Sequence, residues 1–234
     1  MLLSSGFNSR AFFRQSLLLP LLLLSSKQTT NAMSTVANNK PAALIFLHGL
    51  GDTPAGWSSL EYQLPSIKPS LSNLTYIFPP APTIPISING GMTMPGWFDL
   101  FDWPIGVGCQ NDEEGKSKAV TQIEKCVDEL VEKGIDKNRI VIGGFSQGGA
   151  VALRAVYQSE EKYAACVNLS GWLTFDESTM KKSSASVPLM WGHGSFDDKV
   201  LFEQQKYGVD KLREMGVEEI QDSSYPVGHG AHPN

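Results

Sequence analysis

A short glycine-rich stretch places the strongest constraint on how this chain can fold. The apolar segment Ile140–Ile142 runs directly into the pattern Gly144-x-Ser146-x-Gly148, and a segment of helical periodicity follows at once. The pattern alone is weak, but a strand before it and a helix behind it indicate a sharp strand-to-helix turn. Glycine on either side of Ser146 avoids collisions with the neighbouring strand and helix. The stretch predicts a serine hydroxyl raised clear of a sheet; the competing interpretation is a turn that only packs closely.

Short apolar runs rich in β-branched residues alternate with segments of helical periodicity along most of the chain. Such runs, bounded by Gly, Pro or Asn, are typical of strands that are covered on both faces. Strands are expected at Ala42–Leu47, Leu74–Phe78, Ile140–Ile142, Cys166–Leu169, Val187–Trp191 and Ile220–Tyr225. Helices are expected around Ala119, Ile123, Val127 and Leu130, from about Gly148 to Gln158, and over roughly Lys199–Met215. The alternation predicts an α/β fold with a mostly parallel central sheet and helices on both faces.

Composition limits the partners and the compartment. The 234 residues carry a formal net charge of −5, with 41% apolar and 18% charged residues. These values indicate one globular domain, and the acidic balance argues against a nucleic-acid partner, because phosphate binding needs a surplus of Lys and Arg. The cysteines Cys109, Cys126 and Cys166 are widely spaced and form neither a disulfide framework nor a metal-binding pair. A reducing compartment, the cytoplasm, is expected.

Residues 1–32 differ in character from the rest. Arg10 and Arg14 precede the apolar run Leu17–Leu24, and no acidic residue occurs before Asp52. The run is too short to span a bilayer, which takes about 20 residues, but it matches the apolar region of a secretory signal. An organelle transit peptide, or an extension before a start at Met33, fits equally well. We therefore expect a leader over residues 1–32 and a single domain over residues 33–234.

A proline-rich insert interrupts the alternation of strands and helices. The segment from Pro79 to Gly108 holds six prolines together with several apolar aromatic residues. Exposing Phe98, Phe101 and Trp103 together would be costly, so the segment is expected to be a long ordered loop or a broken cap. Loops of this length inside a compact domain tend to be functional.

A serine hydroxyl needs a base to become a nucleophile. In the nucleophile elbow of α/β-hydrolases, an acid and then a histidine follow the serine along the chain. His48 precedes Ser146, and His193 comes too early for a base that follows the acid. His229, between glycines after the last expected strand, is preferred as the base, and His232 remains an alternative. No cysteine or carboxylate lies near this pair, so no metal site is expected.

The acid and the oxyanion donors are assigned to two further loops. Asp197 follows the fifth expected strand and is the preferred acid, with Asp198 as the alternative or as a helix cap. One oxyanion donor is the backbone N–H after the nucleophile, at Gln147, and the other should come from the loop after an early strand, at Leu50. In this second loop, His48 is expected to brace the backbone by hydrogen bonds.

Taken together, these segments resemble the acyl-protein thioesterase and carboxylesterase family, also described as lysophospholipase-like serine hydrolases. The resemblance spans about residues 42 to 232 in the family's order. The matching segments are Phe46–Asp52, Met94–Asp99, Gly143–Ala150, Leu169–Leu173 and His193-Gly194-x-x-Asp197. The resemblance implies the triad Ser146, Asp197 and His229, the oxyanion donors Leu50 and Gln147, and substrate contacts at Met94, Trp97 and Trp172. For Trp97, plain core packing is an equal alternative.

The resemblance implies a serine hydrolase that cleaves carboxylic esters or thioesters through an acyl-enzyme, without a cofactor or a metal. The expected partners are acylated proteins or small acyl esters, with transient contact at a membrane surface. The family carries a helix after the catalytic histidine, whereas this chain ends at Asn234, so the resemblance predicts a missing C-terminal helix. The alternatives are an inactive truncated binding module, a lysophospholipase and a serine peptidase of the same fold.

Overall fold

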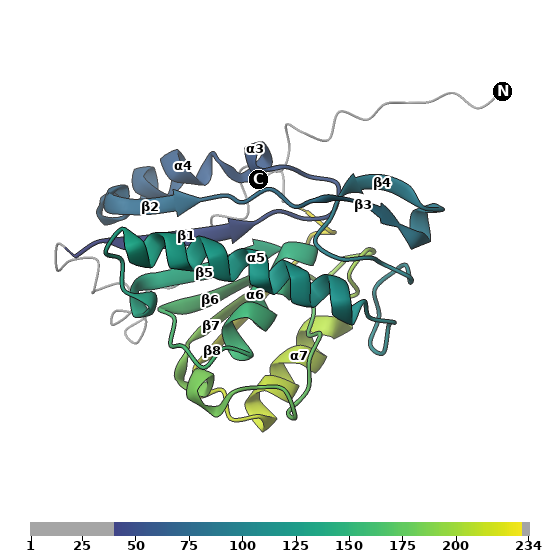
Figure 1. Ribbon diagram of the computed structural model, residues 1–234. Coiled ribbons are helices and arrows are strands. Elements are labelled where there is room, and N and C mark those ends of the chain that lie inside the picture. Colours follow the sequence, from purple (N-terminus) through teal and green to yellow (C-terminus); the bar gives the residue numbers. More distant parts are fainter. Residues whose placement is uncertain (1–39, 231–234) are drawn as a thin grey trace.

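A six-stranded sheet forms the centre of the computed structural model, which describes residues 40–230 (Figure 1). The order is β2-β1-β5-β6-β7-β8, and every neighbouring pair is parallel. The strands are β1 (Ala42–Leu47), β2 (Leu74–Ile77), β5 (Ile140–Phe145), β6 (Ala165–Leu169), β7 (Leu189–Gly194) and β8 (Ile220–Tyr225). Each of the six apolar runs forms one of these strands, so the expected parallel sheet is confirmed.

Burial explains why these strands could be recognised in the sequence. All six residues of β1 and all six of β7 are buried, as expected for inner strands covered on both sides. The edge strands β2 and β8 are only partly buried. The apolar content of each run therefore follows its position in the sheet.

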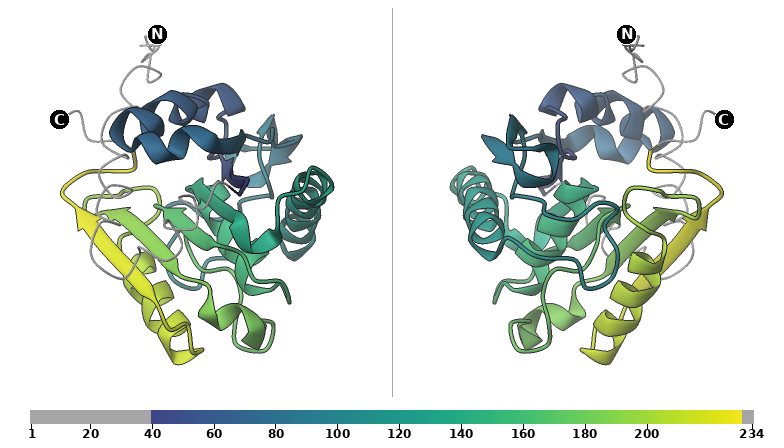
Figure 2. Two further views of the ribbon diagram at one scale, coloured as in Figure 1. Left: turned by 90° about the vertical axis from the view of Figure 1, so that its left-hand side faces the viewer. Right: turned by 90° about the vertical axis from the view of Figure 1, so that its right-hand side faces the viewer.

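Helices cover both faces of the sheet, as expected (Figure 2). On one face, α5, α6 and α7 pack on the larger apolar core, which includes Ile123, Val156, Val209 and Trp191. On the other face, α3 and α4 contribute Trp57 and Leu60 to a second cluster. The bounds are α3 (Pro54–Trp57), α4 (Leu60–Ile67), α5 (Glu113–Glu132), α6 (Gln147–Tyr157) and α7 (Glu203–Glu214). Short 3₁₀ helices lie at η3 (Pro69–Asn73), η4 (Ser87–Asn89), η5 (Lys137–Arg139) and η6 (Lys182–Ser186).

The helix α7 begins four residues later than expected. The N–H groups of Lys199 and Val200 both donate to Asp197 Oδ1, at 2.9 Å each. These bonds hold the segment after Asp197 in a turn, so that the helix starts only at Glu203. Backbone hydrogen bonds of Ile105 to Lys199 and Leu201 hold the same segment, so the later start of α7 follows from these contacts together.

The proline-rich insert contains an antiparallel pair of strands, β3 (Thr83–Ile86) and β4 (Met92–Pro95). It was expected to be a loop or a broken cap. Proline is tolerated in these strands because each has a free edge. Gly90 and Gly91 make the connection at φ values of 65° and 78°, which glycine adopts without steric cost. Figure 1 shows the pair beside the carboxyl ends of β1 and β5.

Three expectations concern residues that the structure does not describe. The leader over residues 1–32, the alternative base His232 and the missing C-terminal helix all lie outside residues 40–230. Within residues 40–230, no helix has the length and apolar character needed to cross a bilayer.

Candidate active site

Ser146 lies at the junction of β5 and α6 in a strained backbone conformation. Its φ of 54° and ψ of −120° fall in a region that L residues rarely adopt. A β-carbon on Gly144 would lie 2.4 Å from the backbone of Gly148, and one on Gly148 would lie 2.4 Å from the Leu47 carbonyl oxygen. Both flanking positions therefore have no room for a side chain. The sharp turn expected from the sequence is present.

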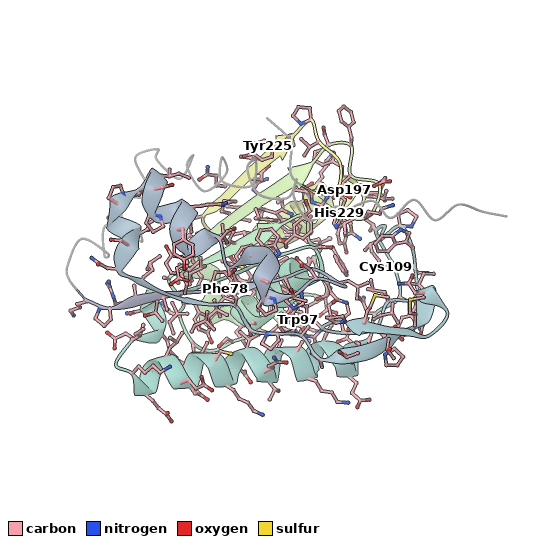
Figure 3. The ribbon with its side chains drawn as sticks, turned by 90° about the horizontal axis from the view of Figure 1, so that it is seen from above. Phe78, Trp97, Cys109, Asp197, Tyr225 and His229 are labelled. Carbon is pink, nitrogen blue, oxygen red and sulfur yellow. The ribbon has the colours of Figure 1, made fainter. Side chains whose placement is uncertain are left out.

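The imidazole of His229 bridges the serine and a carboxylate. His229 Nε2 lies 2.9 Å from Ser146 Oγ, and Nδ1 lies 2.8 Å from Asp197 Oδ2. These residues come from the ends of three strands, and 83 positions separate Ser146 from His229. Figure 3 shows Asp197 and His229 side by side. The structure thus brings together the three residues expected to form the triad.

Asp197 is fully buried, and its carboxylate is surrounded by donors. Oδ1 accepts the N–H groups of Lys199 and Val200, while Oδ2 accepts His229. These donors satisfy oxygen atoms that have lost their contact with water. The alternative acid, Asp198, is 72% exposed and pairs with Lys199 at 3.3 Å. Asp197 rather than Asp198 therefore faces the imidazole.

The loop that carries His229 is fastened to the loop that carries Asp197. Ser195 N donates to Tyr225 O at 2.7 Å, and Phe196 N donates to Val227 O at 2.9 Å. A β-carbon on Gly194 would lie 2.5 Å from the backbone of residues 227 and 228. The close approach of the two backbones fixes the distance between the acid and the base.

The two expected oxyanion donors belong to the start of α6 and to the loop after β1. Gln147 is the first residue of α6, so its N–H has no partner inside the helix. The N–H of Leu50 donates to no residue within the described part of the chain. Gly49 lies against the nucleophile, because a β-carbon there would be 3.4 Å from Ser146 Cβ. A developing negative charge beside Ser146 would face the positive end of α6 and the backbone of this loop.

Comparison with known proteins identifies the family. Residues 30–234 match the family model described as Phospholipase/Carboxylesterase. The chain is 38% identical over 175 residues to acyl-protein thioesterase 1 of Cryptococcus neoformans. The aligned region covers 73% of this chain and 72% of that protein. It is 36% identical over 214 residues to acyl-protein thioesterase 1 of Debaryomyces hansenii, with 87% and 91% covered. The structure of Arabidopsis thaliana SOBER1 superposes with a TM-score of 0.77 and 31% identity, covering 82% and 92%.

This chain belongs to the phospholipase/carboxylesterase family. The expected resemblance and the α/β-hydrolase fold are thereby confirmed. The expectation that the chain is a hydrolytic enzyme is confirmed as well.

In this phospholipase/carboxylesterase, the side chain of Gln147 has a role that the sequence did not reveal. It is fully buried, its Oε1 accepts Trp97 N at 2.8 Å, and its Nε2 donates to Phe98 O at 2.7 Å. The residue beside the nucleophile thus clamps the proline-rich insert through two backbone groups. Because the partners lie about 50 positions away, no local pattern could have indicated the clamp.

His48 connects the loop after β1 to the same insert, and these contacts agree with its expected bracing role. Its Nδ1–H donates to Gly49 O at 2.8 Å, and its Nε2 accepts Ala81 N at 3.1 Å. Trp97 Nε1 donates to the carbonyl oxygen of His48 at 2.8 Å. Burial lowers the pKa of His48, which favours the neutral ring that can both donate and accept.

The three expected substrate contacts differ in position. Trp97 and Trp172 are each only 2% exposed and belong to the larger core, whereas Met94 is partly buried against it. Trp97 also lines a cavity of about 310 Å³ together with Ile84 and Gln122. The packing alternative for Trp97 therefore stays open beside the binding one.

Proposed function

We propose that this hydrolase cleaves fatty acyl thioesters of proteins and small carboxylic esters, with Ser146, His229 and Asp197 as its triad. The observation that carries the proposal is the unbroken contact from Ser146 Oγ to His229 Nε2 and from His229 Nδ1 to Asp197. The names of the thioesterase relatives support the choice of acylated proteins as substrates.

In the first half of the reaction, Ser146 Oγ attacks the acyl carbonyl carbon while His229 Nε2 takes the hydroxyl proton. The carbonyl oxygen becomes an oxyanion, for which the N–H groups of Leu50 and Gln147 are the proposed donors. Asp197 holds the imidazole in the tautomer that leaves Nε2 free to accept, and it stabilises the imidazolium. The tetrahedral intermediate then collapses, the bond to the leaving sulfur or oxygen breaks, and His229 returns the proton to it.

In the second half, water takes the place of the leaving group. His229 Nε2 removes a proton from water as the oxygen attacks the acyl-serine carbonyl. The second oxyanion collapses to release the carboxylic acid, and His229 protonates Ser146 Oγ. The cycle consumes one water and uses no cofactor.

The proposed partners agree with three exposed apolar side chains, two in the proline-rich insert and one next to Asp197. Met92, Trp103 and Phe196 are 65%, 44% and 71% exposed. Trp103 and Met92 belong to the proline-rich insert, and Phe196 is the neighbour of Asp197. Exposed aromatic and long apolar side chains favour transient contact with a membrane surface, where acyl substrates reside.

The proposed domain and compartment follow from the same features. We assign residues 33–234 to the hydrolase domain and residues 1–32 to a leader, since the described residues share one central sheet. The cytoplasm is the proposed compartment, because Cys109, Cys126 and Cys166 are free thiols.

The test of this function is hydrolysis by the purified chain across acyl lengths and bond types. Palmitoyl-thioester peptides, p-nitrophenyl esters and a lysophospholipid are compared, with Ser146→Ala as the control. We expect turnover of thioesters and esters, and a loss on the order of 10⁴-fold or more in Ser146→Ala. Turnover of the lysophospholipid alone would assign the chain to the other activity of the family. Turnover that survives in Ser146→Ala would contradict the proposal.

A further inference from the structure

His193 lies fully buried on β7, four residues before Asp197. Its order in the chain excludes it as the base of the proposed triad. Its Nε2 lies 2.9 Å from the carbonyl oxygen of Val200 and 3.4 Å from Asp197 Oδ2. The candidate acid therefore has an imidazole on either side, His229 and His193.

The contacts determine which nitrogen of His193 carries the proton. A carbonyl oxygen only accepts hydrogen bonds, so Nε2 must be protonated to donate to Val200 O. Nδ1 is buried and has no hydrogen-bond partner among residues 40–230. Burial, the largest cause, lowers the pKa of His193, the hydrogen bond to Val200 and the charge of Asp197 raise it, and the charge of His229 lowers it, so that the net direction is downward. The ring is therefore neutral, with its N–H directed at Val200 and Asp197.

Val200 links this N–H to the carboxylate by a second route. The N–H of Val200 donates to Asp197 Oδ1, and the carbonyl group of the same residue accepts His193 Nε2. His193 thus holds the turn whose backbone holds Oδ1. At 3.4 Å, the direct contact with Oδ2 is electrostatic, and it acts on the oxygen that His229 uses.

We propose that His193 is a positioning residue, which acts on the reaction through Asp197. This inference rests on the proposed triad. It fixes the turn from Asp197 to Val200 and places an N–H dipole beside Oδ2. The dipole makes Oδ2 a weaker base, so that the proton shared with His229 Nδ1 stays on the imidazole. His193 does not touch the substrate.

The surroundings leave few other charges that could produce this effect. Among residues 40–230, the charges that act on His193 are those of Asp197 and His229. Asp198 and Lys199, which follow Asp197, pair with each other at 3.3 Å and are more exposed. The ring of Phe202 packs 6.0 Å from the His193 ring on the side of α7. His229 itself faces Ser146, Asp197 and the Phe145 ring.

The variant His193→Phe removes the donor and keeps an aromatic ring in the site. We expect kcat to fall about 10-fold or more with KM nearly unchanged, because a misplaced base affects the chemical step. Without the N–H beside it, Oδ2 keeps more negative charge toward His229, so the acid limb of the kcat/KM profile moves to higher pH. His193→Gln, which keeps a donor, should restore most of the loss.

A matched control separates positioning from loss of stability. Met190→Ala changes another buried residue of β7, but one in the core on the opposite face. It should lower the melting temperature without moving the pH limb. Equal kcat in His193→Phe and the wild type, or an acid limb that stays or moves to lower pH, would overturn the proposal while leaving the triad intact. If the wild-type protein itself hydrolysed neither thioesters nor esters, the result would instead contradict the proposed function.

The protonation state of His193 can also be measured in the wild-type protein, so this test does not depend on the folding of a variant. In ¹⁵N-histidine-labelled protein at neutral pH, we expect His193 to be the neutral Nε2–H tautomer, because its Nε2 donates to the carbonyl oxygen of Val200. An Nδ1–H tautomer at His193, or a doubly protonated ring at neutral pH, contradicts the proposal.

Discussion

Ser146 occupies a backbone conformation that costs on the order of 1–3 kcal/mol for a residue with a side chain. The surrounding glycines make the conformation attainable, since Gly144 and Gly148 both lie against backbone atoms. The same crowding brings the Leu47 carbonyl next to the start of α6. At this scale, the motif is a steric solution to placing one hydroxyl at a helix N-terminus.

Replacing Gly148 by alanine tests this steric account. A β-carbon there would lie 2.4 Å from Leu47 O and 2.6 Å from His48 O, and neither backbone group can move freely. We expect Gly148→Ala to lower the free energy of unfolding by about 2 kcal/mol or more. In the control Gly106→Ala, the atom nearest to the added β-carbon would be 3.5 Å away. The free energy of unfolding should therefore change by no more than about 0.5 kcal/mol. Urea denaturation measures both, and equal stabilities would refute the account.

Gln147→Leu tests the clamp on the proline-rich insert. The substitution leaves Trp97 N and Phe98 O without the partners they have in the native protein. An unsatisfied buried group costs about 1–3 kcal/mol, so thermal unfolding should shift downward. If the insert also contacts the acyl chain, KM for long acyl substrates should rise more than KM for acetyl esters. An unchanged melting temperature together with unchanged KM values would show that the clamp has no role.

At the scale of elements, an ionic cluster fastens the start of α5 to α6 and to the loop after β6. Lys116 Nζ and Arg154 Nη1 contact Glu113 at 2.6 Å and 2.8 Å, and both also approach Thr174 O. Lys116 is only 1% exposed, whereas Glu113 is 62% exposed. The carboxylate therefore compensates two cations that have largely lost contact with water.

Glu113→Gln should destabilise the protein at neutral pH but hardly at low pH. Burial opposes ionisation of Glu113, but the hydrogen bonds and charges of Lys116 and Arg154 outweigh it and lower its pKa. A lowered folded-state pKa stabilises the protein above the ordinary value of 4.5, and this stabilisation is lost as the pH falls through the folded-state pKa. The difference between variant and wild type should therefore vanish in acid.

The neighbouring Glu114→Gln is the control for this experiment. Glu114 pairs with Lys118 at 2.6 Å, but both side chains are exposed. Exposed ion pairs contribute about 0–1 kcal/mol to stability. The stability of Glu114→Gln should therefore stay close to that of the wild type at neutral and at low pH. Equal losses of stability in the two variants at neutral pH would mean that the buried cluster stabilises the protein no more than an exposed ion pair does.

Some helices and strands could be predicted from the sequence alone, and others could not. The runs Ala42–Leu47 and Ile220–Tyr225 match β1 and β8 residue for residue, because their boundaries coincide with changes in burial or turn chemistry. The pair β3–β4 was missed, since prolines in Thr83–Ile86 and Met92–Pro95 argue against strands unless a free edge is assumed. The start of α7 depended on hydrogen bonds to the Asp197 side chain, which periodicity does not encode.

At the scale of the whole molecule, the parallel sheet is what brings the candidate site together. The carboxyl ends of β5, β7 and β8 lie at one edge, so the segments that follow them carry Ser146, Asp197 and His229 to one place. Chain order and motif context were sufficient to select these residues from the sequence. The supporting contacts of Gln147 and His193 required the three-dimensional structure, because their partners are set by packing rather than by local pattern.

The most direct test of the central claim is labelling of the native chain by a fluorophosphonate, with the modified residue located by mass spectrometry. We predict a single phosphonyl group on Ser146, no labelling of Ser146→Ala or of the denatured chain, and much slower labelling of His229→Ala, which lacks the base. A folded protein that stays unlabelled, or one that carries the group on another serine, would contradict the account.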